Sequence, residues 1–353
     1  MRHLSVPSQE TQRILHLLKT ESALPEGARV RSDPSDSDRR IIPFTENVSQ
    51  SILDQFPIID IEVEEPPPRT YREHLADLLP VDVFESTDWP TRHEFVGDLI
   101  LIKLDEIQRQ YGDAIGEALL RQHSRIRAVF EDLGVIDTFR VRDLRLLAVR
   151  DGHEPTTRTQ TSVNGHNLWT DPATVYYSSK LHHERDRTLD CAKRLRDELG
   201  RPLTVCDPYA GVGPALVSLL AEEDLIERAW GSDLNPDAVD LMKENLSEYN
   251  NIDIHCMDAL SLSNIPELRG NFDVLLINIP HSTLSHLPSA IPLLRESTPT
   301  LLRGWIVVEE SKISATKEEI RNIFPMDSEL EFSIRRSYSS TQLLCRFEIR
   351  MNH

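Results

Sequence analysis

The stretch VCDPYAGVGPALVSLL, residues 205–220, constrains the fold of this chain more than any other segment. An apolar run ends at Asp207, a turn of small residues follows, and a second apolar run begins after Pro214. This order predicts a buried strand that enters a helix through a glycine turn. Strand-like and helix-like runs continue to alternate beyond it, which predicts a doubly wound, mostly parallel sheet.

The whole chain is predicted to be an α/β protein of three domains. Residues 1–68 form a small N-terminal α/β domain that ends at three consecutive prolines, and residues 69–94 are predicted to be a linker. Residues 95–195 form a middle α/β domain. Residues 196–353 contain the regular strand–helix alternation and are predicted to be a Rossmann-like domain.

Composition excludes several classes of protein. The four cysteines are widely spaced and form no CxxC pair, so neither a disulfide framework nor a zinc site is expected, which fits a reducing cytoplasm. We expect no metal, because no Cys/His cluster with ligand spacing is present, and no membrane span, because no apolar run approaches about 18 residues. The net charge of −19 argues against a nucleic-acid partner, although arginines concentrated in the middle of the chain allow a local basic groove.

The glycine turn restricts the ligand that this sheet could bind. Ligands of open α/β sheets lie beyond the carboxyl ends of the strands. The turn lacks both the GxGxxG spacing and the Gly-Lys-Ser/Thr of a phosphate loop, which disfavours a pyrophosphate. Asp207 could instead receive an ammonium group, and the amides of Gly211 and Gly213 could approach a carboxylate.

Two more aspartates follow the next predicted strands. Asp233 is placed to accept from ribose hydroxyls, and Asp258 to accept from an adenine amino group. Each aspartate alone would be explained equally well as a helix cap or turn residue. Together with Asp207 they predict a site for S-adenosylmethionine, which also includes Leu234 and Asn278.

At these residues the chain resembles the archaeal and eukaryotic tRNA methyltransferases that modify N1 of guanine at position 37, 3′ of the anticodon. The resemblance spans nearly the whole chain and is weakest before residue 95. It rests on the motifs DPYAGVGP, SDLNPDAVDLMKENL, NIPHS, RAVFEDLGVIDTFRVRDLRLLA, DPATVYYSSKLHHERDR and RSYSSTQLLCRFEI. Tyr209 departs from the family's phenylalanine, and Ile279 from its leucine.

The resemblance implies S-adenosylmethionine as cofactor, tRNA as substrate and a cytoplasmic monomer. Glu184 would be the general base that removes the N1 proton, and Arg140 would stabilise charge on O6. Taken without the resemblance, Glu184 would be an exposed helix carboxylate paired with Arg185 or Arg187. Strand alternation places Arg140 and Arg142 on one face, so only the resemblance selects Arg140.

The remaining assignments also come from the resemblance. Asn278 and Pro280 would hold the target base, with Tyr176 and Arg185 beside it. Tyr176 and Lys180 are further assigned to the cofactor site. Lys180 stands where the family often has an arginine that reaches the cofactor carboxylate, and lysine loses the bidentate geometry.

Two other functions stay open on the sequence. A sister family of the wybutosine pathway transfers the aminocarboxypropyl group of the same cofactor, and Pro214 and Asp233 favour methyl transfer over that reaction. A tRNA-binding protein without catalytic activity is the second alternative. The presence of Arg140 and Glu184 argues against it.

Overall fold

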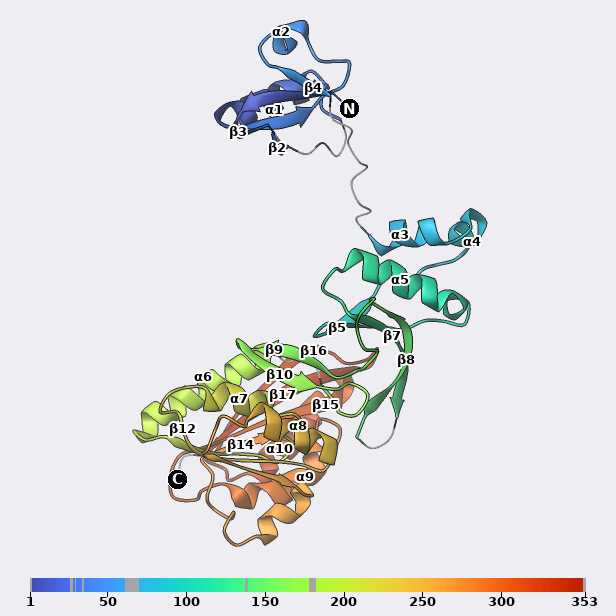
Figure 1. Ribbon diagram of the computed structural model, residues 1–353. Coiled ribbons are helices and arrows are strands. Elements are labelled where there is room, and N and C mark those ends of the chain that lie inside the picture. Colours follow the sequence, from blue (N-terminus) through green and yellow to red (C-terminus); the bar gives the residue numbers. More distant parts are fainter. Residues whose placement is uncertain are drawn as a thin grey trace. The chain divides into compact units, whose positions relative to one another are not determined.

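The computed structural model describes residues 2–25, 28, 30–33, 35–60, 70–136, 139–177 and 182–351, apart from the side chains of Ser37 and His182. The chain divides into two compact units, Met1–Arg69 and Thr70–His353. Both combine helices with sheets (Figure 1), which confirms the predicted α/β class. Each unit is described by itself below.

The first unit is a four-stranded antiparallel sheet of order β2-β3-β1-β4 with helices against it. Ile14 and Leu18 lie one helical turn apart on α1 and are fully buried with Leu4 and Val6 of β1. The elements are β1 (Arg2–Pro7), α1 (Thr11–Thr20), β2 (Arg31–Asp33), β3 (Asp36–Pro43), α2 (Gln50–Leu53) and β4 (Ile58–Asp60).

The second unit opens with helices where a linker was predicted over residues 69–94. Helices α3 (Tyr71–Leu78) and α4 (Val81–Ser86) occupy most of that range. Thr70 caps α3 in a capping box with Glu73, and Leu75 is fully buried against α5 (Gly112–Gln122). The segment is therefore part of a hydrophobic core that it shares with α5.

The next sheet has the order β5-β6-β7-β8, with β6 and β7 parallel and the other pairs antiparallel. A separate hairpin, β9 and β10, follows it. These elements are β5 (His93–Val96), β6 (Leu99–Ile102), β7 (Ala128–Ile136), β8 (Val141–Val149), β9 (Thr159–Val163) and β10 (His166–Thr170). Helix α6 (His182–Leu199) packs through Ala192 and Leu195 into the core of the following sheet. The predicted boundary at residue 195 thus falls inside a helix.

The third sheet has seven strands in the order β13-β12-β11-β14-β15-β17-β16. The first five strands are parallel and β17 is antiparallel to both of its neighbours. The strands are β11 (Leu203–Asp207), β12 (Ile226–Asp233), β13 (Ile252–Cys256), β14 (Val274–Ile277), β15 (Thr300–Glu309), β16 (Glu329–Ser337) and β17 (Gln342–Met351). The helices between them are α7 (Pro214–Leu220), α8 (Pro236–Asn245), α9 (Thr283–Ala290) and α10 (Ile313–Ile323).

Successive side chains of the central strands enter two different cores. Val205 packs with α6, α7 and α8, whereas its neighbour Cys206 packs with α9 and α10. Val274 and Leu275 of β14 divide in the same way. The sheet is therefore covered by helices on both faces (Figure 1), and its carboxyl edge is left to form a site.

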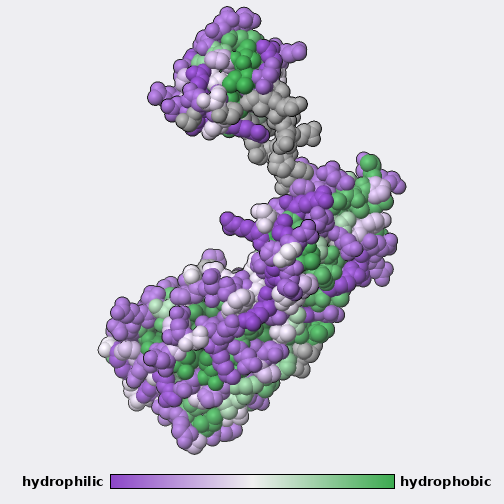
Figure 2. All heavy atoms as spheres, in the orientation of Figure 1, coloured by the Kyte–Doolittle hydropathy of each residue, from purple (hydrophilic) through white to green (hydrophobic). Residues whose placement is uncertain are grey.

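Hydrophilic residues dominate the visible face of each unit (Figure 2), in keeping with a net charge of −19. Within the part of the chain that the structure describes, no helix has the length and apolarity that a membrane crossing requires.

Candidate active site

A cavity of about 420 Å³ lies at the carboxyl edge of the seven-stranded sheet. It is bounded by the turns after β11, β12 and β14, and by the residue that precedes β8. Most of the side chains predicted from the sequence line it together: Arg140, Tyr176, Arg185, Gly211, Asp233, Leu234, Asp258, Asn278 and Pro280. Asp207, Gly213 and Glu184 are not among its lining residues, and Lys180 lies outside the described residues.

The two glycines of the turn have different roles. Both adopt left-handed backbone conformations, with φ of +56° at Gly211 and +87° at Gly213. A Cβ on Gly211 would meet little, because its nearest neighbour is the Tyr176 carbonyl oxygen at 4.0 Å, and Gly211 lines the cavity. A Cβ on Gly213 would lie 3.0 Å from Leu246 Cδ1 and 3.2 Å from Met242 Cγ. Gly213 is thus required by the packing of α7 on α8, and only Gly211 faces the cavity.

The three strand-end aspartates also differ in their surroundings. Asp207 is 3% exposed and accepts a hydrogen bond from Tyr209 N at 3.2 Å. Burial raises its pKa to about 7, and the negative charge of Asp233 contributes in the same direction. Its carboxylate stabilises the turn through the Tyr209 amide and does not line the cavity, whereas it was predicted to receive an ammonium group of the ligand.

Asp233 and Asp258 both line the cavity while shaping the backbone around it. Asp233 accepts from Gly211 N and from Asn235 N, each at 2.9 Å, and burial raises its pKa. Asp258 accepts from Leu260 N at 3.0 Å and caps a short 3-10 helix over residues 259–264. Both aspartates therefore line the cavity and also act as turn or cap residues, and their contact with a ligand stays a prediction.

These residues fit S-adenosylmethionine. Gly211 leaves open space where backbone can approach a ligand. The Leu234 side chain is 57% exposed beside the Asp233 carboxylate, so an apolar surface for an adenine ring adjoins an acceptor for ribose hydroxyls. The cavity thus combines an acceptor, an apolar surface and room for a ligand beside the backbone of Gly211. The amides of Gly211 and Gly213, which were predicted to approach a carboxylate, donate instead to Asp233 and to the Ala210 carbonyl.

Arg140 and Arg142 are separated by the structure, although alternation predicted that they share a face. Arg140 precedes β8 in a turn with φ of +59°, so strand periodicity does not extend to it. It lines the cavity, donates to the Tyr338 hydroxyl at 2.9 Å and lies 6.0 Å from the Tyr176 ring centroid. Arg142 instead pairs with Glu94 at 2.9 Å and Asp132 at 3.4 Å.

Glu184 is a buried member of an ionic cluster, not an exposed helix carboxylate paired with Arg185 or Arg187. It is 6% exposed at the start of α6 and bonds to Arg335 Nε. Arg303 and Arg346, which are almost wholly buried, lie 3.9 and 3.8 Å from its Oε2. Trp305 Nε1 donates to that same oxygen at 3.3 Å, and the Trp305 side chain lines the cavity.

Several aromatic and imidazole side chains in the cavity wall were missed in the sequence. His286 Nδ1 lies 2.8 Å from the Tyr209 hydroxyl, and His281 Nε2 lies 2.9 Å from the Tyr338 hydroxyl. Tyr209 was visible only as a departure from the family's phenylalanine. Trp305 sits inside an apolar strand, where nothing in the sequence distinguishes it from a core residue.

Arg185 and Tyr176 occupy the same wall. Arg185 is 8% exposed and stacks over the Tyr177 ring at 5.4 Å, and burial lowers its pKa. Tyr176 is half exposed, so it is not the buried core tyrosine that competed with a stacking role.

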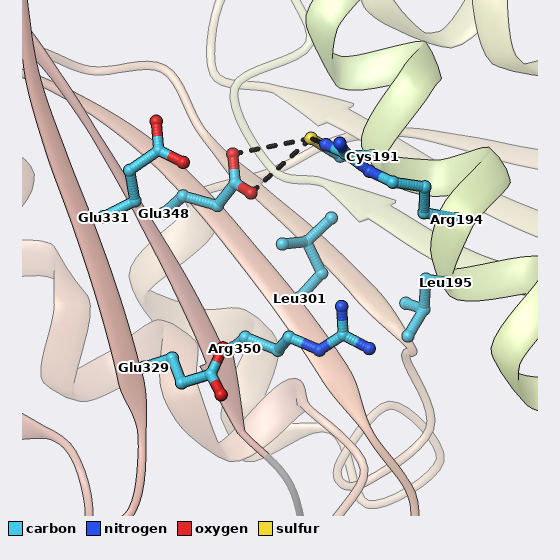
Figure 3. A pocket seen from close by; sticks show the side chains of 8 residues that line it. All are labelled: Cys191, Arg194, Leu195, Leu301, Glu329, Glu331, Glu348 and Arg350. Atoms are coloured by element: carbon cyan, nitrogen blue, oxygen red, sulfur yellow. Dashed lines mark hydrogen bonds between the residues drawn. The ribbon is translucent and has the colours of Figure 1, made fainter.

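A second cavity of about 300 Å³ lies between α6 and the strands β15, β16 and β17 (Figure 3). Cys191 and Arg194 of α6 face Glu348 of β17, and Arg194 Nη2 and Arg303 Nη1 donate to Cys191 Sγ at 3.0 and 2.9 Å. Arg303 also pairs with Glu348. This polar layer anchors α6, and through it Glu184, to the sheet. The described residues contain no group of three potential metal ligands.

Comparison with protein families gives two matches that together cover most of the second unit. The family described as TRM5/TYW2 methyltransferase domain matches residues 159–314. The family described as TYW2 N-terminal domain matches residues 71–153. The two matches meet in the segment between β8 and β9, well before the boundary predicted at residue 195.

Similar proteins and solved structures are named Trm5 or TYW2, as the matched families are. The tRNA (guanine(37)-N(1))-methyltransferase Trm5b of Pyrococcus abyssi is 28% identical over 244 residues, 67% of each protein. A solved complex of aTrm5 and tRNALeu superposes with a TM-score of 0.72, 22% identity and full coverage of both chains. TYW2 of P. horikoshii, solved with MeSAdo, gives 0.62 at 18% identity, covering 80% of this chain and 98% of that one. These superpositions establish a shared fold.

Proposed function

We propose, from the premise that this chain belongs to the TRM5/TYW2 methyltransferase family, that it transfers the methyl group of S-adenosylmethionine to N1 of guanosine 37 in tRNA. The observation that carries the proposal is a single cavity in which Gly211, Asp233 and Leu234 adjoin Arg140 and Asn278. The matched relative named for this activity supports it.

The chemistry defines what the cavity must do. Guanine N1 carries a proton and gains nucleophilicity only as that proton leaves, while negative charge builds on O6. S-adenosylmethionine, when bound, supplies a methyl group on a positively charged sulfur. Asn278 and Pro280 hold the base in place, and the guanidinium of Arg140 donates to O6.

Glu184 is proposed to take the N1 proton. Its Oε2 accepts a hydrogen bond from Trp305, whose side chain lines the cavity, and its Oε1 accepts one from Arg335. Catalytic hydrogen bonds often assume their working geometry only when substrate is bound. We therefore propose that guanine binding draws Glu184 from Arg335 towards N1.

The substrate must bring guanosine 37 out of its stack to reach this cavity. We propose that residues 1–68 recognise the tRNA body while the middle and C-terminal domains hold the anticodon region. Of the arginines concentrated in the middle of the chain, Arg127 is paired with Asp98, and Arg185 is buried. Shape recognition therefore contributes more than phosphate pairing at these positions. Monomeric state and cytoplasmic location stay predictions.

Two labels of the cofactor test the proposal. Unmodified tRNA carrying guanosine 37 is incubated with either methyl-labelled or carboxyl-labelled S-adenosylmethionine. Methyl label in N1-methylguanosine after digestion is the expected result. Carboxyl label in the tRNA would show the aminocarboxypropyl transfer of the TYW2 branch, and binding of tRNA with neither label would show a protein without catalytic activity.

A further inference from the structure

Arg140 holds a backbone conformation that arginine rarely adopts. Its φ of +59° lies in the left-handed region, which residues with a Cβ seldom occupy unless their surroundings impose it. The cause is not a strand constraint, because β8 begins only at Val141. Contacts of the Arg140 side chain with other segments hold this turn.

Those contacts reach two segments far away in the sequence. Arg140 Nη2 lies 2.9 Å from the hydroxyl of Tyr338, which lies between β16 and β17. The same hydroxyl lies 2.9 Å from Nε2 of His281, in the turn after β14. The rings of Tyr338 and His281 also meet edge to face, with centroids 5.1 Å apart. Arg140, Tyr338 and His281 all line the cavity.

The chemistry of the groups fixes the direction of the hydrogen bond between Arg140 and Tyr338. A guanidinium can only donate, so the Tyr338 oxygen accepts from Arg140. The hydroxyl keeps its own proton, and it donates this proton to His281 in the tautomer whose Nε2 is unprotonated. Partial burial and the positive charge of Arg140 both lower the pKa of His281, in keeping with a neutral ring.

We propose that Tyr338 and His281 are positioning residues that hold Arg140 in the orientation needed to donate to the target base. The inference rests on the proposed function, in which Arg140 binds O6 of guanine. A guanidinium has five N–H donors, so the bond to Tyr338 leaves others for an acceptor in the cavity. Small displacements of such a donor are costly, because charge stabilisation depends on preorganised geometry.

The test combines single-turnover methylation with hydrogen exchange. Tyr338→Phe removes only the hydroxyl, and at saturating tRNA and cofactor we expect the methylation rate to fall about tenfold while cofactor affinity is retained. His281→Ala should slow the reaction, and His281→Gln, whose amide oxygen can accept from Tyr338, should restore most of the rate. Adding His281→Ala to Tyr338→Phe should cost little more, because both act through Arg140.

Hydrogen exchange tests the contact between Arg140 and Tyr338 independently of any enzymatic activity. The backbone amides of residues 139–142 should exchange faster in Tyr338→Phe than in the wild type. Tyr111→Phe, the same change outside the cavity, should alter neither exchange nor rate.

The results separate this inference from the proposed function. If the wild type forms N1-methylguanosine but Tyr338→Phe keeps its rate within about twofold, the positioning role is overturned. Equal loss of cofactor affinity and rate would overturn it as well. A wild type that forms no N1-methylguanosine would refute the function, and unchanged exchange in residues 139–142 would refute the contact independently.

Discussion

Asp207, at the end of β11, is an ionisable residue in an almost fully buried position. Its carboxylate accepts a hydrogen bond from Tyr209 N. Burial raises its pKa to about 7, well above the ordinary aspartate value of 3.8. Between these two values the folded protein binds a proton that the unfolded chain does not.

The consequence is a pH dependence of stability with a definite sign. A raised folded-state pKa stabilises the fold at low pH, and the contribution is lost as pH rises from about 4 to about 7. Asp207→Asn, which stays neutral, should therefore be more stable than the wild type at pH 8, and the difference should shrink towards pH 5. Thermal unfolding of both proteins without cofactor measures it. A difference that does not vary with pH would contradict the assigned pKa.

At the scale of elements, helix α6 is held to the sheet by ion pairs between side chains as well as by apolar contacts. Arg303 and Arg346 lie on β15 and β17 and face the carboxylates of Glu184 and Glu348. Removing one partner of a buried ion pair leaves the other uncompensated, which destabilises a protein. The position of Glu184 is thus coupled to the attachment of the whole helix.

A matched pair of variants separates the proposed catalytic role of Glu184 from this structural one. Glu184→Gln and Glu348→Gln should each lower the free energy of unfolding by about 1–3 kcal/mol, because each removes a charge from the arginine cluster. Only Glu184→Gln should also slow single-turnover methylation, by at least about 100-fold, with cofactor affinity retained. Equal slowing in both variants would assign Glu184 a purely structural role.

At the scale of the whole molecule, the two units have separate hydrophobic cores. Leu4, Ile14 and Ile42 belong to a core confined to the first unit, and the predicted site lies wholly in the second. This division supports the proposal that the first unit contributes to tRNA recognition and not to the chemistry.

Deletion of residues 1–69 tests that division of labour. The remaining chain should bind S-adenosylmethionine as tightly as the full protein, while its affinity for full-length tRNA falls. Methylation of a short anticodon stem–loop should change little, because that RNA lacks the tRNA body. Equal losses with both RNAs would place the role of the first unit elsewhere.

Local patterns were enough to predict the α/β class, the mostly parallel sheet and the carboxyl edge at which the cavity lies. Period-2 and helical spacing are properties of neighbouring residues, so they can be read without knowing the fold. The linker predicted over residues 69–94 was wrong, because burial of Leu75 depends on a distant helix, α5. The prediction that Arg140 and Arg142 share a strand face was also wrong, because β8 starts at Val141 and Arg140 lies in the turn before it.

The sequence by itself determined which residue types end the strands, and hence that Asp233, Asp258 and Gly211 meet at one edge. Only the tertiary structure decided that Gly213 serves helix packing, that Asp207 lies beneath the turn and that Glu184 is surrounded by arginines. These outcomes depend on contacts between segments far apart along the chain. Burial and charge pairing of that kind are set by the packed molecule and leave no periodic trace in the sequence.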